Sequence, residues 1–199
     1  SLIDAADATP IPLINTAIYS TIRSRLIEQF GGCVEIFIVG GAAINRETEE
    51  FLHTIKFPLT VGYGMTECAP LISFELPQLF KLGSCGRILP SYLFESKIMS
   101  RDPKNIPGEL LVRGEHVMKG YYKNEEATNA VLDEDGWLHT GDMGYVTDKH
   151  PGYLWVVGRF KSLLISADGE KYSPEGFEDS LTDGSKYIEQ VILHNNQDP

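Results

Sequence analysis

The 199-residue sequence predicts a mixed α/β protein in which an α/β part is followed by a part rich in β-strands. Two observations lead to this fold class. In the first 80 residues, an apolar pattern of helical period alternates with short apolar runs that end at glycines, as in strand–helix–strand units. Between residues 81 and 158, several short apolar runs are separated by turn signals, which is typical of a small barrel or sandwich.

Two helices are expected in the first part, residues 1–80. Apolar residues recur at helical spacing over residues 14–30, and the pair Gly31-Gly32 gives this helix a C-terminal stop. Asn45 is expected to cap a second helix, because its side-chain oxygen can accept a hydrogen bond from a backbone N–H of the first turn.

Two strands of this first part are predicted to end at glycine-containing turns. Residues 34–39 form the first strand and lead into Gly40-Gly41. Residues 59–61 form the second strand and lead into the turn V-G-Y-G-M-T-E. Since ligands of parallel α/β sheets gather beyond the carboxyl ends of the strands, both turns are candidate ligand-binding segments.

The chain continues with a second part, residues 81–158, and a third part, residues 159–199. Strands of the second part are predicted at residues 92–99, 109–113, 143–147 and 153–157, with turns at Pro107-Gly108 and Asp135-Gly136 and a short helix capped by Asn124. The third part is predicted to hold a strand in S-L-L-I-S, a turn at Asp168-Gly169, a helix starting at Ser173-Pro174 and a last strand over 187–194. This part is too short to be a self-sufficient domain.

Composition and charge narrow the class of protein. The formal net charge is −11 and the isoelectric point is about 4.9, which disfavours a nucleic-acid binder because such proteins present a basic face. The three cysteines, Cys33, Cys68 and Cys85, form no C-x-x-C pair, so a disulfide framework or a zinc site is not indicated and a reducing compartment fits best. No apolar run approaches the roughly 20 residues of a membrane span, and a cytoplasmic location is expected.

The turn V-G-Y-G-M-T-E combines residue types that suit a nucleotide with its metal. Tyr63 offers a flat face on which a base can stack, and Gly62 and Gly64 let the backbone approach a ligand closely. Thr66 can donate a hydrogen bond to a phosphate oxygen, and Glu67 can hold a hard cation such as Mg2+. Taken alone, the same residues could also form a plain strand-to-helix turn.

Three further segments allow either a ligand role or a structural one. The run G-G-A-A at residues 40–43 can approach a ligand or form a tight turn. Asp142, in H-T-G-D-M-G, can accept from two vicinal ribose hydroxyls or stabilise its own turn. Arg159 and Lys161 lie between two apolar strands, where they are surface charges, part of a hinge or ligand contacts. His139 is interpreted as structural, because no base or nucleophile pattern surrounds it.

The order of five motifs is more specific than any one of them. The motifs are V-G-G-A-A, V-G-Y-G-M-T-E, G-E-L-L-V-R-G-E-H-V-M-K-G-Y-Y, D-G-W-L-H-T-G-D-M-G and V-G-R-F-K-S-L-L-I-S-A-D-G-E-K-Y-S-P-E-G-F-E. This succession, within residues 36–193, resembles the adenylate-forming (AMP-binding) superfamily of acyl-CoA synthetases, luciferases and adenylation domains. Met65, K-L-G-S-C-G-R-I-L-P-S and Y-I-E-Q-V-I-L resemble the long-chain fatty acid–CoA ligase branch.

The resemblance implies a two-step ligase reaction with ATP, Mg2+ and coenzyme A. A carboxylic acid, here a long-chain fatty acid, attacks the α-phosphate of ATP to give an acyl-adenylate and pyrophosphate. The thiol of coenzyme A then displaces AMP. Catalysis of this kind depends on positioning and on stabilising the charge that develops at the α-phosphate.

The resemblance also assigns roles to residues of this chain. Nucleotide-binding positions are implied at Gly41, Ala42, Ala43, Gly62, Tyr63, Gly64, Thr66, Asp142 and Arg159. Among them Tyr63 would stack on the adenine, residues 41–43 would line the adenine side and the acyl pocket, and Asp142 and Arg159 would bind the ribose hydroxyls. Thr66 would contact the α-phosphate and, with Glu67, would act in catalysis. Glu67 would hold Mg2+. Lys161 falls at the hinge of the lid domain, and the loop around Gly169 would approach the pantetheine arm of coenzyme A.

Two parts of the family pattern are expected outside this chain, a phosphate loop upstream of residue 1 and a lysine downstream of Pro199. The chain is therefore expected to be a fragment: residues 1–80 a partial α/β subdomain, 81–158 a β-barrel-like subdomain and 159–199 the truncated start of the C-terminal lid. Alone, it is expected to be inactive and to self-associate through the exposed edge of its sheet. Peripheral membrane contact is expected of the full-length enzyme.

Two alternative functions remain open from the sequence. The first is an aryl- or amino-acid-activating enzyme of the same superfamily, which acid-binding residues upstream would distinguish. The second is a non-catalytic binding or interaction module.

Overall fold

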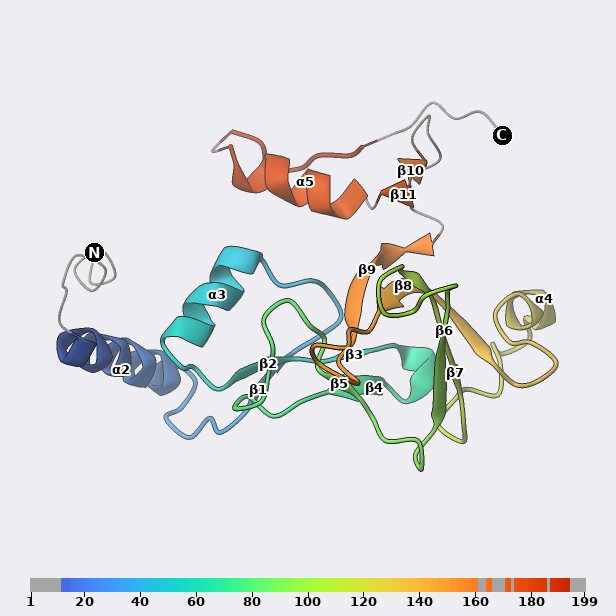
Figure 1. Ribbon diagram of the computed structural model, residues 1–199, viewed down its shortest axis with the longest axis horizontal. Helices are drawn as coiled ribbons and strands as arrows, with labels where there is room; N and C mark the ends of the chain where they lie inside the picture. The colour runs from blue at the N-terminus through green and yellow to red at the C-terminus, as the bar shows by residue number, and fades with distance from the viewer. Residues whose placement is uncertain (1–11, 161–163, 166–170, 173, 186, 194–199) are drawn as a thin grey trace. The chain divides into compact units, whose positions relative to one another are not determined.

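The structure, a computed structural model, describes residues 12–160, 164–165, 171–172, 174–185 and 187–193 (Figure 1). The described chain divides into two compact units. The first unit holds the described residues up to Met65 together with Leu71–Arg87, and the second holds Thr66–Pro70 and the described residues from Ile88 onward. The division into three subdomains at residues 80 and 158 stays a prediction.

The described part of the first unit begins with α2 (Pro12–Gln29), close to the helix predicted over residues 14–30 (Figure 1). The two glycines close its C-terminus. Gly31 N–H donates to the carbonyl of Glu28 at 3.0 Å, and Gly32 N–H donates to the carbonyl of Ile27 at 2.9 Å. Both glycines have positive φ, +89° and +80°, which other residues adopt only at a cost. The glycine pair therefore ends the helix as expected.

Helix α3 (Arg46–Thr54) connects two parallel strands, β1 (Phe37–Val39) and β2 (Leu59–Val61). Its cap is Asn45, whose Oδ1 accepts from Thr48 N–H at 3.0 Å, as predicted. Because the two strands run parallel, their carboxyl ends lie at the same edge of the pair.

The core of the first unit forms at the end of α3 and the start of β2. Ile55, Phe57 and Leu59 are buried there. Partly buried apolar side chains of α2, β1, α3 and the loop before α3 pack against them, namely Tyr19, Ile22, Leu26, Ile27, Phe37, Val39, Ile44, Phe51 and Leu52. This packing fixes α2 and α3 against the strand pair and so positions the turns that follow β1 and β2.

The segment after β2 is more regular than a simple turn. Tyr63–Gly64 forms β3, which pairs antiparallel with β4 (Leu71–Phe74), and β5 (Arg87–Ile88) completes a three-stranded sheet. Between β3 and β4, Thr66–Cys68 forms the short 3-10 helix η1. The motif is therefore divided between a strand and a helical turn.

The second unit contains an antiparallel sheet in the order β6-β7-β8-β9 (Figure 1). The strands are β6 (Glu95–Met99), β7 (Gly108–Arg113), β8 (Leu138–Tyr145) and β9 (Trp155–Arg159). Its buried side chains include Leu110, Leu111, Val112, Leu138 and Leu154. A short helix, α4 (Glu125–Asn129), is capped by Asn124, whose Oδ1 accepts from Ala127 N–H at 3.0 Å. The mixed α/β class with a β-rich second part is confirmed.

Several strand boundaries of this sheet differ from the prediction: β9 covers 155–159 rather than 153–157, β8 ends at residue 145 rather than 147, and β7 starts one residue early. The starts of β6 and β8 differ most. Strand β6 starts at Glu95 rather than residue 92, because Leu93 N–H donates within a turn to the carbonyl of Pro90. Strand β8 starts at Leu138 rather than residue 143, because H-T-G-D pairs with β7 although its glycine suggested a loop. Pairing with a neighbouring strand overrides local propensity in the second case.

The last part contains a two-stranded antiparallel pair, β10 (Leu164–Ile165) and β11 (Lys171–Tyr172), and the helix α5 (Pro174–Asp183). Proline occupies the first helical position, as predicted. The predicted turn at Asp168-Gly169 and the cap at Ser173 lie outside the described residues. No helix within the described residues is both long and apolar enough to cross a membrane.

The predicted strand over residues 187–194 is wrong for its described part. Residues 187–193 contain no strand. The backbone N–H of Leu193 donates instead to Oε1 of Glu178 in α5, at 2.7 Å. An apolar run becomes a strand only where a partner strand accepts its backbone groups, and here a helix side chain provides the acceptor.

Candidate functional site

The two glycine turns lie side by side at the carboxyl ends of β1 and β2. Gly62 N–H donates to the carbonyl of Val39 at 2.9 Å, so the parallel pairing continues into both turns. A Cβ on Gly40 would lie 3.2 Å from the carbonyl oxygen of Gly62, and a Cβ on Gly62 would lie 3.3 Å from that of Ser73. A side chain at either position would therefore press against neighbouring backbone. This packing favours glycine whether or not a ligand also approaches.

The neighbouring positions of the first unit have more open surroundings. Gly41 has a φ of +88°, and no atom lies within 4 Å of where its Cβ would be. Ala42 and Ala43 follow it and are exposed. Tyr63 is half-buried in β3, and the β3–β4 register shifts between Tyr63 and Gly64. The residues predicted to lie on the adenine side are thus found in an accessible turn and in an irregular strand.

Glu67, the predicted Mg2+ ligand, is held by a tyrosine that sequence reasoning missed. The hydroxyl of Tyr121 donates to Oε1 of Glu67 at 2.7 Å, and Met118 N–H donates to the carbonyl of Glu67 at 2.8 Å. The hydrogen bond to the carboxylate raises the pKa of Tyr121, with burial as a smaller cause. Tyr121 belongs to the quoted K-G-Y-Y motif, but a separation of 54 positions gave no signal for the contact.

The surroundings of Glu67 fit a cation only together with further ligands. Oε2 of Glu67 has no hydrogen-bond partner among the described residues, so one carboxylate oxygen is available. Within the described part of the chain, no three His, Cys, Asp or Glu side chains gather as a metal cluster. Mg2+ commonly binds through one or two carboxylates plus phosphate oxygens and water, so the donor set fits Mg2+ on a nucleotide.

Asp142 and Arg159, the predicted ribose ligands, are cross-strand partners on β8 and β9. Arg159 Nε lies 3.4 Å from Oδ1 of Asp142. The Asp142 side chain is only 13% exposed, whereas that of Arg159 is 67% exposed. The strand register therefore brings together a shielded carboxylate and an accessible cation, and their ligand role remains a prediction.

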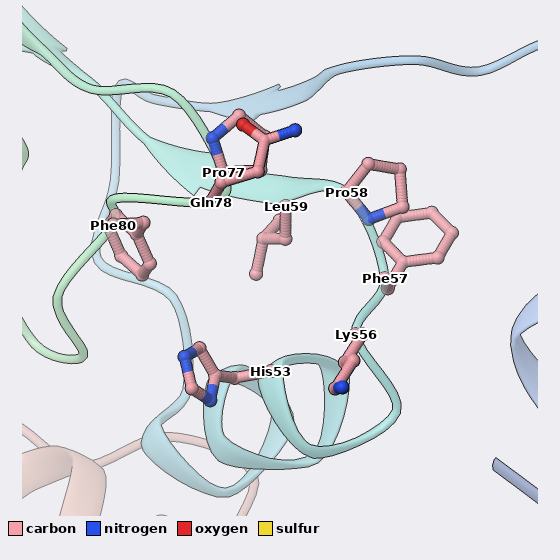
Figure 2. A pocket seen from close by; sticks show the side chains of 8 residues that line it. All are labelled: His53, Lys56, Phe57, Pro58, Leu59, Pro77, Gln78 and Phe80. Atoms are coloured by element: carbon pink, nitrogen blue, oxygen red, sulfur yellow. The ribbon is translucent and has the colours of Figure 1, made fainter. Parts of the chain in front are cut away.

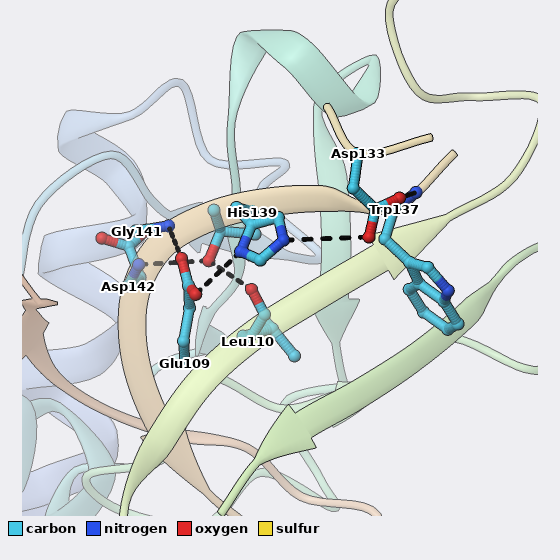
Figure 3. Close-up of polar contacts among 8 residues, drawn as sticks. Glu109, Leu110, Asp133, Trp137, His139, Gly141 and Asp142 are labelled. Atoms are coloured by element: carbon cyan, nitrogen blue, oxygen red, sulfur yellow. Dashed lines mark hydrogen bonds and ion pairs between the residues drawn. The ribbon is translucent and has the colours of Figure 1, made fainter. Parts of the chain in front are cut away.

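His139 and Glu109 form a polar cluster on β8 and β7, next to Asp142 (Figure 3). His139 Nδ1 lies 2.9 Å from Oε2 of Glu109. The sequence interpretation of His139 as structural named no partner, and Glu109 was missed. Lys161 and Gly169, the predicted hinge and loop residues, lie outside the described residues.

A pocket of about 350 Å3 lies elsewhere in the first unit (Figure 2). Its apolar lining includes Phe57, Leu59 and Phe80, and its polar lining includes His53 and Lys56 near the end of α3. The pocket adjoins the amino end of β2, whereas the glycine turns follow the carboxyl end of that strand. None of the predicted site residues lines it.

A family model described as AMP-binding enzyme matches residues 1–122, which is more than half of the chain. The chain belongs to the AMP-binding enzyme family. The family assignment agrees with the adenylate-forming resemblance of the five motifs.

Curated relatives of this AMP-binding chain include two kinds of CoA ligase. The long-chain-fatty-acid–CoA ligase ACSBG2 of Gallus gallus is 34% identical over 181 residues, which cover 91% of this chain and 23% of that protein. The 4-coumarate–CoA ligase 1 of Glycine max is 32% identical over 207 residues, covering 97% of this chain and 69% of that protein. The chain thus spans about a quarter of the length of the first relative.

Solved structures similar to this AMP-binding chain include an o-succinylbenzoate CoA synthetase of Bacillus subtilis. Its complex with the acyl-adenylate intermediate OSB-AMP has a TM-score of 0.69 and 32% identity, covering 86% of this chain and 36% of that chain. Its complex with ATP and magnesium ion has a TM-score of 0.66 and 30% identity, covering 92% and 39%. The fold is therefore that of an adenylate-forming enzyme.

Proposed function

We propose that the protein is an AMP-forming acid–CoA ligase. A carboxylate oxygen of the acid attacks the α-phosphorus of ATP, the bond to the β-phosphate breaks, and pyrophosphate leaves with the bonding electron pair. The thiol of coenzyme A then loses its proton to water, and its sulfur attacks the acyl carbonyl carbon. The bond from that carbon to the phosphate oxygen breaks, and AMP leaves with the bonding electron pair. The observation that carries the proposal is the Asp142–Arg159 pair, a shielded carboxylate beside an exposed cation, in a chain similar to an enzyme solved with an acyl-adenylate.

In this proposal the residues of the chain bind and orient the nucleotide. Asp142 accepts hydrogen bonds from the ribose hydroxyls, with Arg159 beside it, and Tyr63 stacks on the adenine. Thr66 contacts the α-phosphate. Glu67, held by the Tyr121 hydroxyl, would hold Mg2+, which supplies positive charge against the phosphates.

We further propose a long-chain fatty acid as the substrate. Similarity to the Gallus gallus ligase and Met65 in the Y-G-M-T-E motif support this choice. Similarity to a 4-coumarate–CoA ligase of Glycine max, at nearly the same identity, makes an aryl acid the specific alternative. The acid-binding residues decide between them, and an amino acid is the third class to test.

The test is acid-dependent pyrophosphate exchange into ATP by the full-length protein. Palmitate, 4-coumarate and an amino-acid mixture are the three arms, and we expect exchange with palmitate. Exchange only with 4-coumarate would replace the fatty acid by an aryl acid. The absence of exchange in all arms, with a folded protein that also fails to bind AMP, would overturn the ligase proposal.

For the 199-residue chain by itself we propose inactivity and self-association. Three large apolar side chains of the first unit, Phe30, Ile36 and Ile38, are 51%, 44% and 54% exposed. Such a surface favours association of copies. Sedimentation of the purified chain at rising concentration measures the self-association. Robust pyrophosphate exchange by this chain would contradict the proposed inactivity. A cytoplasmic full-length enzyme with peripheral membrane contact is part of the same proposal.

A further inference from the structure

The ladder between β7 and β8 is interrupted beside Asp142. Glu109 pairs with Met143, and Leu111 pairs with His139. The two pairs are thus two residues apart on β7 but four residues apart on β8. Three residues of β8, residues 140–142, therefore face the single residue Leu110 and form a bulge with two extra residues. Bulges redirect side chains and leave backbone groups without their regular cross-strand partners.

Two side chains replace the missing partners within this bulge (Figure 3). Gly141 N–H donates to Oε1 of Glu109 at 3.1 Å. Asp142 N–H donates to Oγ1 of Thr140 at 3.1 Å, and the same Oγ1 donates to the carbonyl of Leu110 at 2.7 Å. Gly141 has a φ of +72°, a conformation that glycine adopts without strain. The backbone on both sides of the Gly141–Asp142 bond is thus tied to β7.

The second oxygen of Glu109 is also engaged. Oε2 lies 2.9 Å from His139 Nδ1, and His139 Nε2 lies 3.9 Å from Oδ2 of Asp133, too far for a hydrogen bond. Asp133 is itself fixed, because its Oδ1 accepts from Trp137 N–H at 2.8 Å and from Asp135 N–H at 3.0 Å. His139 therefore orients the carboxylate of Glu109, and the Glu109 side chain, 22% exposed, has both oxygens engaged.

We propose that Glu109 is a positioning residue for the ribose-binding carboxylate of Asp142. Glu109 holds the backbone of the bulge from the β7 side, while Arg159 contacts the Asp142 carboxylate from the β9 side. Removing Glu109 frees the Gly141 N–H and lets the bulge return toward regular pairing, which turns the Asp142 carboxylate away from the ribose. This inference rests on the proposed function, because it requires Asp142 to bind ribose.

The experiment compares AMP with 2′,3′-dideoxy-AMP by titration calorimetry on the full-length protein. The wild type is expected to bind AMP more tightly than the dideoxy nucleotide. Glu109→Ala is expected to weaken AMP binding about tenfold, as for loss of a charged hydrogen bond, and to leave dideoxy-AMP binding unchanged. Glu109→Gln retains an acceptor for Gly141 N–H and is expected to stay within about threefold of wild type. Glu115→Ala, at an exposed glutamate of the same unit, is the matched control.

A double-mutant cycle separates positioning from general destabilisation. If Glu109 acts through Asp142, Glu109→Ala has no further effect on AMP affinity in an Asp142→Ala background. Equal losses in both backgrounds, or equal losses for both nucleotides, would overturn the inference. Should Glu109→Ala fail to fold, Glu109→Asp, which withdraws the carboxylate by one methylene, takes its place with the same expected pattern.

The outcomes also distinguish this inference from the proposed function. A wild type that binds AMP and dideoxy-AMP equally would remove the ribose role of Asp142 and the inference with it. A wild type that discriminates, with a Glu109→Ala variant that discriminates equally well, would leave the proposed function standing and overturn the role of Glu109 alone.

Discussion

The two units of the molecule hold their predicted nucleotide-binding residues by different means. In the first unit most of these residues are glycines and alanines that follow two parallel strands, and the backbone determines their geometry. In the second unit the predicted ligand residues include two carboxylates, and other side chains hold them or the backbone that carries them: Tyr121 for Glu67, Glu109 and Arg159 for Asp142. Substitutions should therefore act on stability in the first unit and on ligand affinity in the second.

The largest effect is expected from removing the carboxylate of Asp142. Asp142→Ala in the full-length protein should weaken AMP binding more than tenfold, because charged hydrogen bonds to ribose contribute about 1.5–3 kcal/mol. Titration calorimetry measures the affinity. Asp148→Ala, which removes an exposed aspartate paired with Lys104, is the control and should leave AMP binding unchanged. AMP binding that survives Asp142→Ala intact would contradict the ribose role.

A smaller effect is expected from removing the hydroxyl that holds Glu67. Tyr121→Phe should raise the Mg2+ concentration needed for half-maximal ATP binding about fivefold, because the carboxylate loses its orienting donor. Tyr122→Phe is a matched control, since the neighbouring Tyr122 is 88% exposed. ATP binding titrated at several Mg2+ concentrations measures the difference. Equal behaviour of the two variants would mean that Tyr121 does not position Glu67.

In the first unit, Gly41→Ala should act on stability through the backbone. Its φ of +88° is unfavourable for alanine, so we expect a loss of about 1 kcal/mol in the free energy of unfolding. Urea denaturation measures this loss. Gly41→Asn should recover part of it, because asparagine tolerates positive φ better than alanine. If alanine and asparagine cost the same, the positive φ of this position would not be the cause of the loss.

The smallest effect concerns His116, a side chain of the second unit whose two ring nitrogens have no hydrogen-bond partner among the described residues. Burial lowers the pKa of His116 below its usual 6.5, and its ring stacks on Phe94 at a centroid distance of 4.3 Å. Because the lowered pKa belongs to the folded state, the unfolded chain binds the His116 proton more readily. The stability that depends on a neutral His116 is therefore fully present above pH 6.5 and is lost as the pH falls through the lower pKa of the folded state.

Replacing His116 by phenylalanine should therefore flatten the pH dependence of stability below pH 6.5. The stacking partner is retained and the titrating group is removed. Urea denaturation at pH 5.5 and pH 7.5 measures the change. A variant with the same slope as the wild type would assign the pH dependence to other groups.

Local features of the fold were predictable because neighbouring residues determine them. Asn45 and Asn124 cap their helices as expected, and Gly31 and Gly32 end α2, because each effect acts within one helical turn. The strand predicted over 187–194 is wrong for its described residues, 187–193, because a strand depends on a partner that lies elsewhere in the chain.

By itself, the sequence determined the mixed α/β class, the AMP-binding family motifs and the glycine turns that follow β1 and β2. Only the tertiary structure decided which side chains meet: Tyr121 with Glu67, and Glu109 with the bulge that carries Asp142. The physical reason is that turns and caps depend on local backbone preferences. Contacts between distant residues depend on strand register, and a shift of one residue would move every side chain of β8 to the opposite face.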